Sequence, residues 1–482
     1  MGRQTRFRGR TGRPGRALTV VALVLAGLGG LLLSLLMLGP ATSALTALGP
    51  NAKTAYSPTP GPVGTGKIYY VSPGGNDGDG LSWAHAWNSL ETIKWPVMRP
   101  GDTLLLDGGS SSITYTSTLV VSKSGTALAP ITIRVSSEIG HSGRVLIFGG
   151  RSTPLPYCGQ TGYSYQTSGV RLHGIIFNNA THVVIDGGKW DGLAVYGHDS
   201  DGVLFSGGES YDTLRNAEVY DNGTAEVDSA GAWSTDAAGI RALGSHLTFD
   251  LVDVHDNGQD AFQSGGPLNY ITIHHSWLHV ARENPLQPAG SAFNTPCTHQ
   301  DGLQIYAGGM QSFVTIRDSV LGPGLMEGVM LGDVDANISS VTISDSLVIN
   351  GAHNGLIGHP GQTQNNWQID HVTVFMNNPQ DALSWVGNNA SVTKSIFYGG
   401  GFHLPDGLAV SAGNCLWKTG AGSIQIKGLT ANPLFKANVG GFGAFPSLTT
   451  QASADFGLQA ITPCPGVGSS MTSVARLITT AA

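Results

Sequence analysis

Short stretches in which apolar and polar residues alternate recur along most of the chain. Val314–Ser319 reads VTIRDS and Val341–Ser346 reads VTISDS, so one pattern returns after 27 positions. Alternation with a period of two is typical of a β-strand that is buried on one side. Further copies share a central apolar residue, and these residues are Ile185, Leu214, Phe249, Ile273, Ile316, Ile343, Ile369 and Val392. The pattern therefore predicts repeated short strands.

A second, shorter strand pattern lies between these copies. It opens with an acidic residue or Asn before Gly or Ala, and the opening residues are Asp201, Asp260, Asp301, Glu327, Asn354 and Asp381. Copies of the first pattern are 23 to 43 residues apart, which is typical of repeat solenoids. One coil cannot bury its apolar side alone, whereas stacked coils share one core. We therefore predict a single all-β domain, a parallel β-solenoid.

The composition also indicates a β-rich chain with many tight turns. Of the 482 residues, 69 are Gly and only 12% are charged. Low charge together with 41% apolar residues excludes intrinsic disorder. A coiled coil would be rich in Ala, Glu, Lys, Leu and Arg, and collagen would have Gly at every third position, so both are excluded.

The first 44 residues are typical of a secretory signal peptide. Six Arg precede Ala17, the segment Ala17–Leu38 is apolar, and small residues follow up to Ala44. The apolar run is long for a signal peptide, so an uncleaved membrane anchor is the alternative. Both interpretations place the remaining chain outside the cell, either secreted or anchored. Residues 45–66 are rich in Pro, Gly and Thr and are expected to form an extended linker.

Loss of the signal segment would make the chain strongly acidic. Without its six Arg, 19 basic side chains stand against 32 acidic ones, which gives a net charge of 19 − 32 = −13. A nucleic-acid-binding protein neutralises phosphates with an excess of Lys and Arg. We therefore expect no nucleic-acid partner.

Four Cys residues suggest two disulfides. None of them forms the Cys-x-x-Cys spacing of a zinc site. An exported chain is exposed to oxidising conditions, and four Cys allow three pairings. Among these pairings we expect Cys158–Cys297 and Cys415–Cys464.

Both ends of the repeat region resemble a known group of proteins. The first end comprises Ile68–Gly78, Trp87–Leu90 and Arg99–Leu106, and the second comprises Asn432–Phe435 and Asp455–Gln459. They resemble the N-terminal cap and the closing segment of right-handed parallel β-helix proteins in the pectate-lyase/chondroitinase-B-like superfamily. The resemblance covers residues 67–470 and implies a single-stranded right-handed parallel β-helix, followed by a tail at 471–482.

The resemblance implies an exported enzyme that cleaves a uronic-acid or other polysaccharide, as a lyase or a glycosidase. The Gly-His-Gly and Arg-Ile-Lys motifs of polygalacturonases are absent. Lysine is scarce, and among the repeat strands of the central coils only Lys394 occurs. A mechanism with a lysine base therefore lacks an obvious residue, and no specific enzyme family is assigned.

The segment Thr298–Tyr306 holds the first candidate site. His299 and Asp301 precede a strand, and a His beside a carboxylate is a plausible proton-transfer pair. Stacking of the coils places Asp260 before Asp301 and Glu327 after it, so the three form an acidic column. The column predicts catalytic carboxylates or a calcium site, and a purely structural ladder of turn residues is the alternative.

Side chains around this column are expected to bind substrate. Arg241 and Arg282 are candidates for a bidentate pair with a substrate carboxylate. The other candidates are Gln263, Gln304 and Tyr306, and Trp277 is assigned to the core by alternation.

We place the site on the coils from Arg241 to Asp333, beneath insertions at Thr224–Asp236 and Glu283–His299. Lyase-type elimination on an acidic polysaccharide, with His299 as the base, is the first prediction. The alternatives are hydrolysis by two carboxylates of the acidic column and a non-catalytic cell-surface solenoid that binds glycan. We expect the protein to be a monomer.

Overall fold

A computed structural model describes residues 66–155, 168–227, 233–265, 270–279, 301–306, 312–333, 338–350, 353–358, 364–376, 380–387, 389–405, 407–420, 426–437, 455–471 and 473. The predicted signal peptide or anchor and nearly all of the predicted linker lie outside these residues, as do Cys158, Arg282, Cys297 and His299. Within the described ranges, no helix is long and apolar enough to span a membrane.

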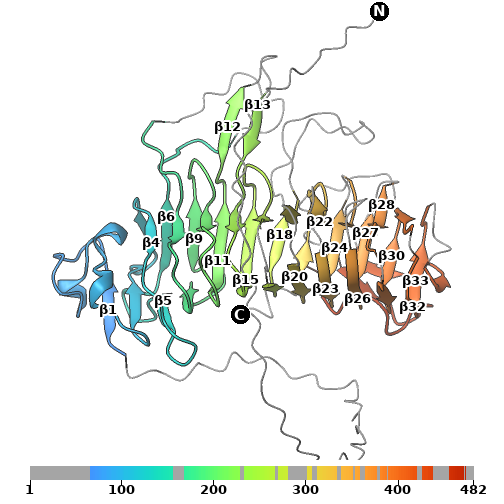
Figure 1. The fold of residues 1–482 in the computed structure, drawn as a ribbon, viewed down its shortest axis with the longest axis horizontal. Coiled ribbons are helices and arrows are strands. Elements are labelled where there is room, and N and C mark those ends of the chain that lie inside the picture. Colours follow the sequence, from blue (N-terminus) through green and yellow to red (C-terminus); the bar gives the residue numbers. More distant parts are fainter. Residues whose placement is uncertain are drawn as a thin grey trace, which may run out of the picture. The chain divides into compact units, whose positions relative to one another are not determined.

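The described chain winds into a solenoid with three faces of parallel strands, and Figure 1 shows the labelled strands following one another in chain order. The first face consists of β1 (Ile68–Val71), β2 (Thr103–Leu106), β5 (Ile131–Val135), β8 (Val183–Asp186), β11 (Thr213–Tyr220), β15 (Leu247–His255), β17 (Tyr270–His274), β20 (Ser312–Arg317), β23 (Ile338–Ser344), β26 (Gln364–Asp370), β29 (Ser391–Thr393) and β32 (Val410–Ala412). The long strands β11 and β15 continue around the corner onto the second face.

The second face contains the latter halves of β11 and β15. Its other strands are β3 (Ser112–Tyr115), β6 (Arg144–Phe148), β9 (Leu193–Tyr196), β18 (Trp277–His279), β21 (Val320–Leu321), β24 (Leu347–Asn350), β27 (Thr373–Met376), β30 (Ile396–Tyr398), β33 (Asn414–Trp417) and β34 (Gly428–Thr430). The third face consists of β4 (Leu119–Val121), β7 (Ile175–Phe177), β10 (Val203–Phe205), β14 (Ile240–Ala242), β16 (Phe262–Ser264), β19 (Leu303–Tyr306), β22 (Val329–Asp333), β25 (Leu356–Gly358), β28 (Asp381–Ser384) and β31 (Gly401–His403).

Short elements accompany the three faces. Three 3-10 helices lie between β1 and β2, and they are η1 (Trp83–His85), η2 (Leu90–Thr92) and η3 (Trp95–Val97). Two antiparallel pairs are β12 (Thr224–Val227) with β13 (Trp233–Asp236) and β35 (Phe435–Ala437) with β36 (Asp455–Leu458).

The register of the strands confirms the repeat that the sequence predicts. On the first face Ile185 pairs with Leu214, and Leu214 pairs with Phe249. The pairing continues through the later reference residues to Val392. All of these side chains are fully buried, because alternation directs every second residue inward. The prediction of a single-stranded right-handed parallel β-helix is confirmed.

Successive coils turn from the first to the second face through one residue in the left-handed backbone region. These residues and their φ values are His275 (48°), Asp318 (50°), Asp345 (47°), His371 (53°) and Lys394 (45°). Short polar side chains are the non-glycine residues that adopt this region most readily. The corner therefore explains the Asp-Ser pairs that end the repeated pattern.

A ladder of serines follows these corner residues. The backbone N–H of Ser276 donates to Oγ of Ser319 at 3.2 Å, and the N–H of Ser319 donates to Oγ of Ser346 at 3.3 Å. All three serines are fully buried. Buried backbone groups need partners, so the serines stabilise a corner that strand pairing alone would leave unsatisfied.

The C-terminal segment, which contains β35 and β36, covers apolar residues on the outer side of the second face. Phe375 of β27 packs against Phe456 of β36, with ring centroids 5.2 Å apart. A disulfide joins Cys415 on β33 to Cys464. This second predicted pairing is therefore confirmed, while Cys158 and Cys297 lie outside the described residues.

Candidate functional site

The predicted acidic column forms where the third-face strands begin. Oδ1 of Asp260 accepts the backbone N–H of Asp301 at 2.9 Å, and Oδ1 of Asp301 accepts the N–H of Glu327 at 3.0 Å. Further along, Oδ1 of Asn354 accepts the N–H of Asp381 at 3.2 Å. Each side chain therefore closes the turn of the next coil, as the structural alternative describes.

Burial makes this column a poor place for substrate chemistry. Asp260 and Asp301 are 0% exposed, and Glu327 is 4% exposed. Burial, followed by the charges of Asp260 and Glu327, raises the pKa of Asp301 well above its usual range. The contacts give the three residues a role in the fold, and their predicted catalytic roles stay predictions. A calcium ion in the column stays a prediction.

The predicted substrate-binding residues of the third face do lie together. Arg241, Gln263 and Gln304 occupy equivalent positions on β14, β16 and β19. Nη1 of Arg241 donates to the Tyr306 hydroxyl at 3.0 Å and also to Oε1 of Gln263. Nε2 of Gln263 donates to Oε1 of Gln304 at 2.9 Å. These groups therefore contact one another.

The charge of Arg241 is balanced within the fold. Its Nε donates to Oδ2 of Asp201 at 2.9 Å. Burial alone lowers the pKa of Arg241, but the hydrogen bond and charge of Asp201 outweigh burial and raise it. Arg241 is thus a permanent cation with a buried counterion, and binding of a uronate would have to compete with Asp201.

A second group of ionisable side chains lies on the outer side of the second face and was not predicted from the sequence. We call it the histidine–carboxylate cluster, and its members are Arg144, Asp191, Glu218, Asp253, His255 and His279. Alternation directs Val252 and Val254 inward and the Asp253 and His255 between them outward. Glu218 pairs in register with Asp253, and His255 with His279.

Close polar contacts join the cluster. Nη2 of Arg144 lies 2.6 Å from Oε2 of Glu218, and Nε2 of His255 lies 3.3 Å from Oε1 of Glu218. Nε2 of His279 lies 3.0 Å from Oδ1 of Asp253. Two carboxylates are therefore each held by a histidine, and Glu218 is also held by a guanidinium.

Two carboxyl groups of the cluster have opposite pKa shifts. Burial, followed by the charges of Asp253 and Glu218, raises the pKa of Asp191 to about 7. Burial also tends to raise the pKa of Glu218, but His255 and Arg144 outweigh it and lower the pKa. One oxygen each of Asp191, Glu218 and Asp253 lies within 4.8 Å of the others. At neutral pH the site thus offers both a proton donor and an ionised carboxylate.

The two histidines also differ in charge. Burial opposes protonation of His255, but hydrogen bonds to Asp256 and Glu218 raise its pKa to about 10. Burial lowers the pKa of His279 despite its contact with Asp253. His255 is therefore a cation at neutral pH, and His279 is a neutral imidazole.

Aromatic rings form a column beside these groups. The ring centroids of Phe148 and Tyr196 are 4.9 Å apart, and those of Tyr196 and Tyr220 are 5.0 Å apart. The stack continues from Tyr220 to His255 at 5.1 Å and from His255 to His279 at 4.8 Å. The column follows from the stacked coils, because each ring occupies the same strand position.

Trp277 extends this surface and corrects one prediction. It pairs with Asp253 on the outer side of the second face and stacks on His279 with centroids 3.6 Å apart, so its assignment to the core is wrong. A shallow depression adjoins His279, and its lining residues are His255, Asp256, Asn257, Gln259, Ala261, His279 and Leu325.

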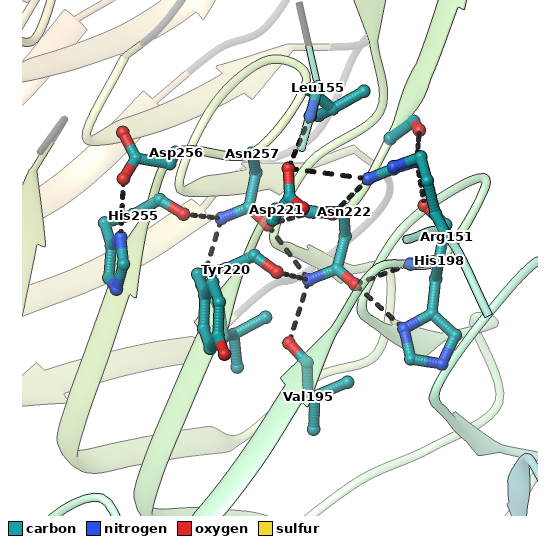
Figure 2. A network of polar contacts seen from close by, with 12 residues as sticks. Arg151, Leu155, Val195, His198, Tyr220, Asp221, Asn222, His255, Asp256 and Asn257 are labelled. Carbon is teal, nitrogen blue, oxygen red and sulfur yellow. Dashed lines mark hydrogen bonds and ion pairs between the residues drawn. The ribbon is translucent and has the colours of Figure 1, made fainter. Parts of the chain in front are cut away.

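A polar network fixes the adjoining corner between the second and third faces (Figure 2). The N–H of Asn222 donates to Oδ1 of Asn257 at 3.1 Å, and Nδ1 of His198 lies 2.8 Å from Oδ1 of Asn222. Arg151 is buried and donates to the carbonyl oxygen of His198 at 2.8 Å. Burial lowers the pKa of His198 to about 4, so this histidine is neutral and belongs to the scaffold.

Comparison with known proteins finds solved structures with a weak likeness to this chain. No family model and no curated protein matches the sequence. A pectate lyase, Pel9A, is 18% identical over 84% of this chain and 92% of its own, with a TM-score of 0.45. A structure of XylC with xylose is 9% identical over 73% and 75%, with a TM-score of 0.47. A rhamnogalacturonan lyase is 12% identical over 86% and 98%, with a TM-score of 0.41.

These similarities concern the course of the backbone. The parallel β-helix that the cap segments indicate is shown by the strand pairing of this chain itself. The reaction has to be argued from the side chains of this chain, because one fold hosts many chemistries.

Proposed function

We propose that this protein is exported and hydrolyses a polysaccharide at the histidine–carboxylate cluster. The observation that carries the proposal is the approach of Asp191, Glu218 and Asp253 within 4.8 Å. The pKa of Asp191 is raised to about 7 and that of Glu218 is lowered. Glycoside hydrolysis uses such a pair, one carboxyl group protonated and the other ionised.

Each carboxyl group has a role in this reaction. Asp191 donates its proton to the glycosidic oxygen, and Glu218 attacks the anomeric carbon to form a glycosyl ester. Asp191 then removes a proton from water, and the resulting hydroxide group displaces Glu218. Carboxyl groups about 5 Å apart favour this two-step route, because a one-step displacement needs room for water between them. Arg144 and His255 keep Glu218 ionised for the attack.

A carbohydrate substrate suits the surroundings of the cluster. Tyr196 and Tyr220 are partly exposed beside the cluster. Their ring faces are covered by the stack, but their phenol hydroxyls can exchange hydrogen bonds with the hydroxyl groups of a sugar. The N-terminal apolar segment and the Cys415–Cys464 disulfide support export.

Elimination from a uronate is the second candidate, and it is the reaction that the sequence predicts first. The observation in its favour is the row of Arg241, Gln263, Gln304 and Tyr306 on the third face, which are brought together as predicted. His299, the predicted base, lies outside the described residues. In this reaction Arg241 would hold the carboxylate while a base removes the neighbouring proton.

A substrate screen separates the two reactions. The chain is incubated with neutral and acidic polysaccharides, with and without chelator, while reducing ends and the ultraviolet absorbance of unsaturated uronates are followed. Hydrolysis releases reducing ends without the absorbance, and Asp191→Asn should abolish that release. Asp186→Asn is the matched control, because Asp186 lies on the first face and pairs with Arg215 at 2.7 Å. Absorbance that survives Asp191→Asn would instead support elimination on the third face.

A further inference from the structure

A third group of chemically active side chains lies at the corner between the first and second faces. Asp250 of β15 pairs in register with His274, the last residue of β17. His275 follows as the corner residue, with a φ of 48°. The side chains of Asp250, His274 and His275 are 9%, 5% and 22% exposed. This group shares no residue with the histidine–carboxylate cluster, and neither proposed reaction uses it.

Three ligand atoms of this group form a nearly equilateral triangle. Oδ1 of Asp250 lies 2.9 Å from Nδ1 of His274 and 3.0 Å from Nδ1 of His275. The two Nδ1 atoms lie 3.0 Å apart. Every pair of atoms is therefore at hydrogen-bonding distance.

Hydrogen bonds alone cannot make all three contacts of this triangle favourable while the carboxylate of Asp250 is ionised. An Asp is ordinarily ionised at neutral pH. If both Nδ1 atoms carry hydrogen, both bond to Asp250 but two N–H donors face each other. If one Nδ1 atom lacks hydrogen, its lone pair faces the carboxylate oxygen. In each case one of the three contacts is repulsive.

We propose that Asp250, His274 and His275 bind a divalent transition-metal ion, with zinc as the first candidate. Zinc lies about 2.0–2.1 Å from His nitrogen and carboxylate oxygen atoms. A triangle with these sides has a circumradius of roughly 1.7 Å, so an ion about 1.1 Å above its plane reaches all three atoms. One cation then turns all three contacts into ligand bonds and keeps a fourth coordination position for a further ligand.

The ligand set indicates which ions bind. Two imidazoles and one carboxylate suit zinc, iron, cobalt, nickel or copper, whereas calcium and magnesium prefer oxygen ligands alone. This site therefore differs in chemistry from a calcium site in the acidic column. His275, the most exposed of the three ligands, gives the ion its path from solvent.

The charged side chains that neighbour Asp250 and His274 on adjacent strands do not prevent metal binding. Arg215 is the register partner of Asp250 on β11, and it forms an ion pair with Asp186 at 2.7 Å. Arg317 is the partner of His274 on β20, and it lies 3.3 Å from Asp318. Because each guanidinium has its own carboxylate, the net field at the triangle stays small.

Metal binding would join two successive coils. Asp250 and His274 belong to adjacent strands, so a shared ion cross-links β15 to β17. An ion that binds only the folded chain stabilises it by mass action. Zinc should therefore raise the melting temperature as well as bind.

The test uses the untagged chain after treatment with chelator. Zinc binding is measured by calorimetry and cobalt binding by visible absorption. We expect one equivalent to bind through this site, and His275→Ala and Asp250→Asn to weaken that binding by at least about tenfold. His371→Ala is the matched control, because His371 occupies the same corner position and, among the carboxylates of the described residues, contacts Asp370 alone, at 2.8 Å.

Three outcomes would overturn the proposal. The first is a wild-type chain that binds neither ion in stoichiometric amount. The second is binding that His275→Ala leaves unchanged but His279→Ala abolishes, which would place the ion at Asp253, His255 and His279. The third is calcium competing equally with zinc. Circular dichroism tests whether each variant is folded. If His275→Ala does not fold, His275→Gln is measured in its place.

Discussion

Neighbouring residues decide what each carboxyl group of this protein can do. Asp191 and Glu218 lie in one cluster, yet the pKa of the first is raised to about 7 and that of the second is lowered. The difference arises because Glu218 contacts Arg144 and His255, while Oδ1 of Asp191 is buried without a hydrogen-bond partner among the described residues. In the proposed reaction, the same kind of side chain therefore serves as acid in one place and as nucleophile in another.

The proton on Asp191 should set the alkaline limit of activity. If Asp191 is the general acid, kcat/KM should fall tenfold for each pH unit above about 7, because the acid has lost its proton. A pH–rate profile on the best substrate measures this limit. A profile that stays flat up to pH 9 would show that Asp191 does not donate the proton.

Asp191 should also make stability depend on pH. Its pKa is higher in the folded chain than the value of 3.8 expected when unfolded, so its unfavourable contribution grows as pH rises from about 4 to about 7. At pH 8, Asp191→Asn should therefore raise the free energy of unfolding by about 1 kcal/mol after allowance for solvent screening. Denaturation at pH 5 and pH 8 measures it, and an equal effect at both would contradict the shift.

The sequence could not reveal the histidine–carboxylate cluster, although it did reveal the acidic column. Asp260, Asp301 and Glu327 open three successive coils at one recognisable place, before Gly or Ala, so their stacking follows from the repeat. Glu218 and Asp253 lie in the latter halves of β11 and β15, beyond a corner that the hydrophobic pattern does not mark. The alternation Val252-Asp253-Val254-His255 was the available signal, and only the register joins it to Glu218.

At the scale of elements, ladders of hydrogen-bonded side chains stabilise the corners, where strand pairing leaves backbone groups without partners. Ser276, Ser319 and Ser346 bond along one corner, and Asn222 and Asn257 bond along another. The acidic column does the same where the third face begins. Its position followed from the sequence but its burial did not, because a turn carboxylate can accept a backbone N–H or face solvent.

Substitution of one serine tests how much the serine ladder contributes to stability. Ser319→Ala removes the acceptor for the N–H of Ser276 inside the core, so the free energy of unfolding should fall by about 1–3 kcal/mol. Ser344→Ala is the control, since Ser344 ends β23 half-buried on the outer side, and it should change stability by less than about 0.5 kcal/mol. Equal effects would mean that the ladder contributes nothing.

At the scale of the whole molecule, the stacked coils form one core and the C-terminal segment covers part of its outer side. The repeat period predicted this core, because each coil buries its apolar residues only against its neighbours. The closing segment was recognised by resemblance, and its contacts with Phe375 and Tyr398 explain why it belongs to the domain. The closing segment is distant in sequence from the strands that it covers. The periodicity of the repeat therefore does not predict these contacts.

The disulfide should hold that segment in place. Its Cys residues are 49 positions apart, and closing a loop of this length stabilises the folded chain by about 4 kcal/mol in the chain-entropy model. Cys464→Ser should therefore lower the free energy of unfolding by about 2–4 kcal/mol. Urea denaturation of the variant and of the wild-type chain, each without reductant, measures the difference, and coincident curves would refute it.

The central claim is that the second face, and not the acidic column, carries the chemistry. The most direct measurement is kcat/KM on the best polysaccharide for Glu218→Gln and Asp301→Asn, with circular dichroism to establish folding. We predict that Glu218→Gln loses at least about 10²-fold, because the nucleophile is gone, while folded Asp301→Asn stays within about tenfold of the wild-type chain. Full activity in Glu218→Gln together with inactivity in folded Asp301→Asn would contradict the account.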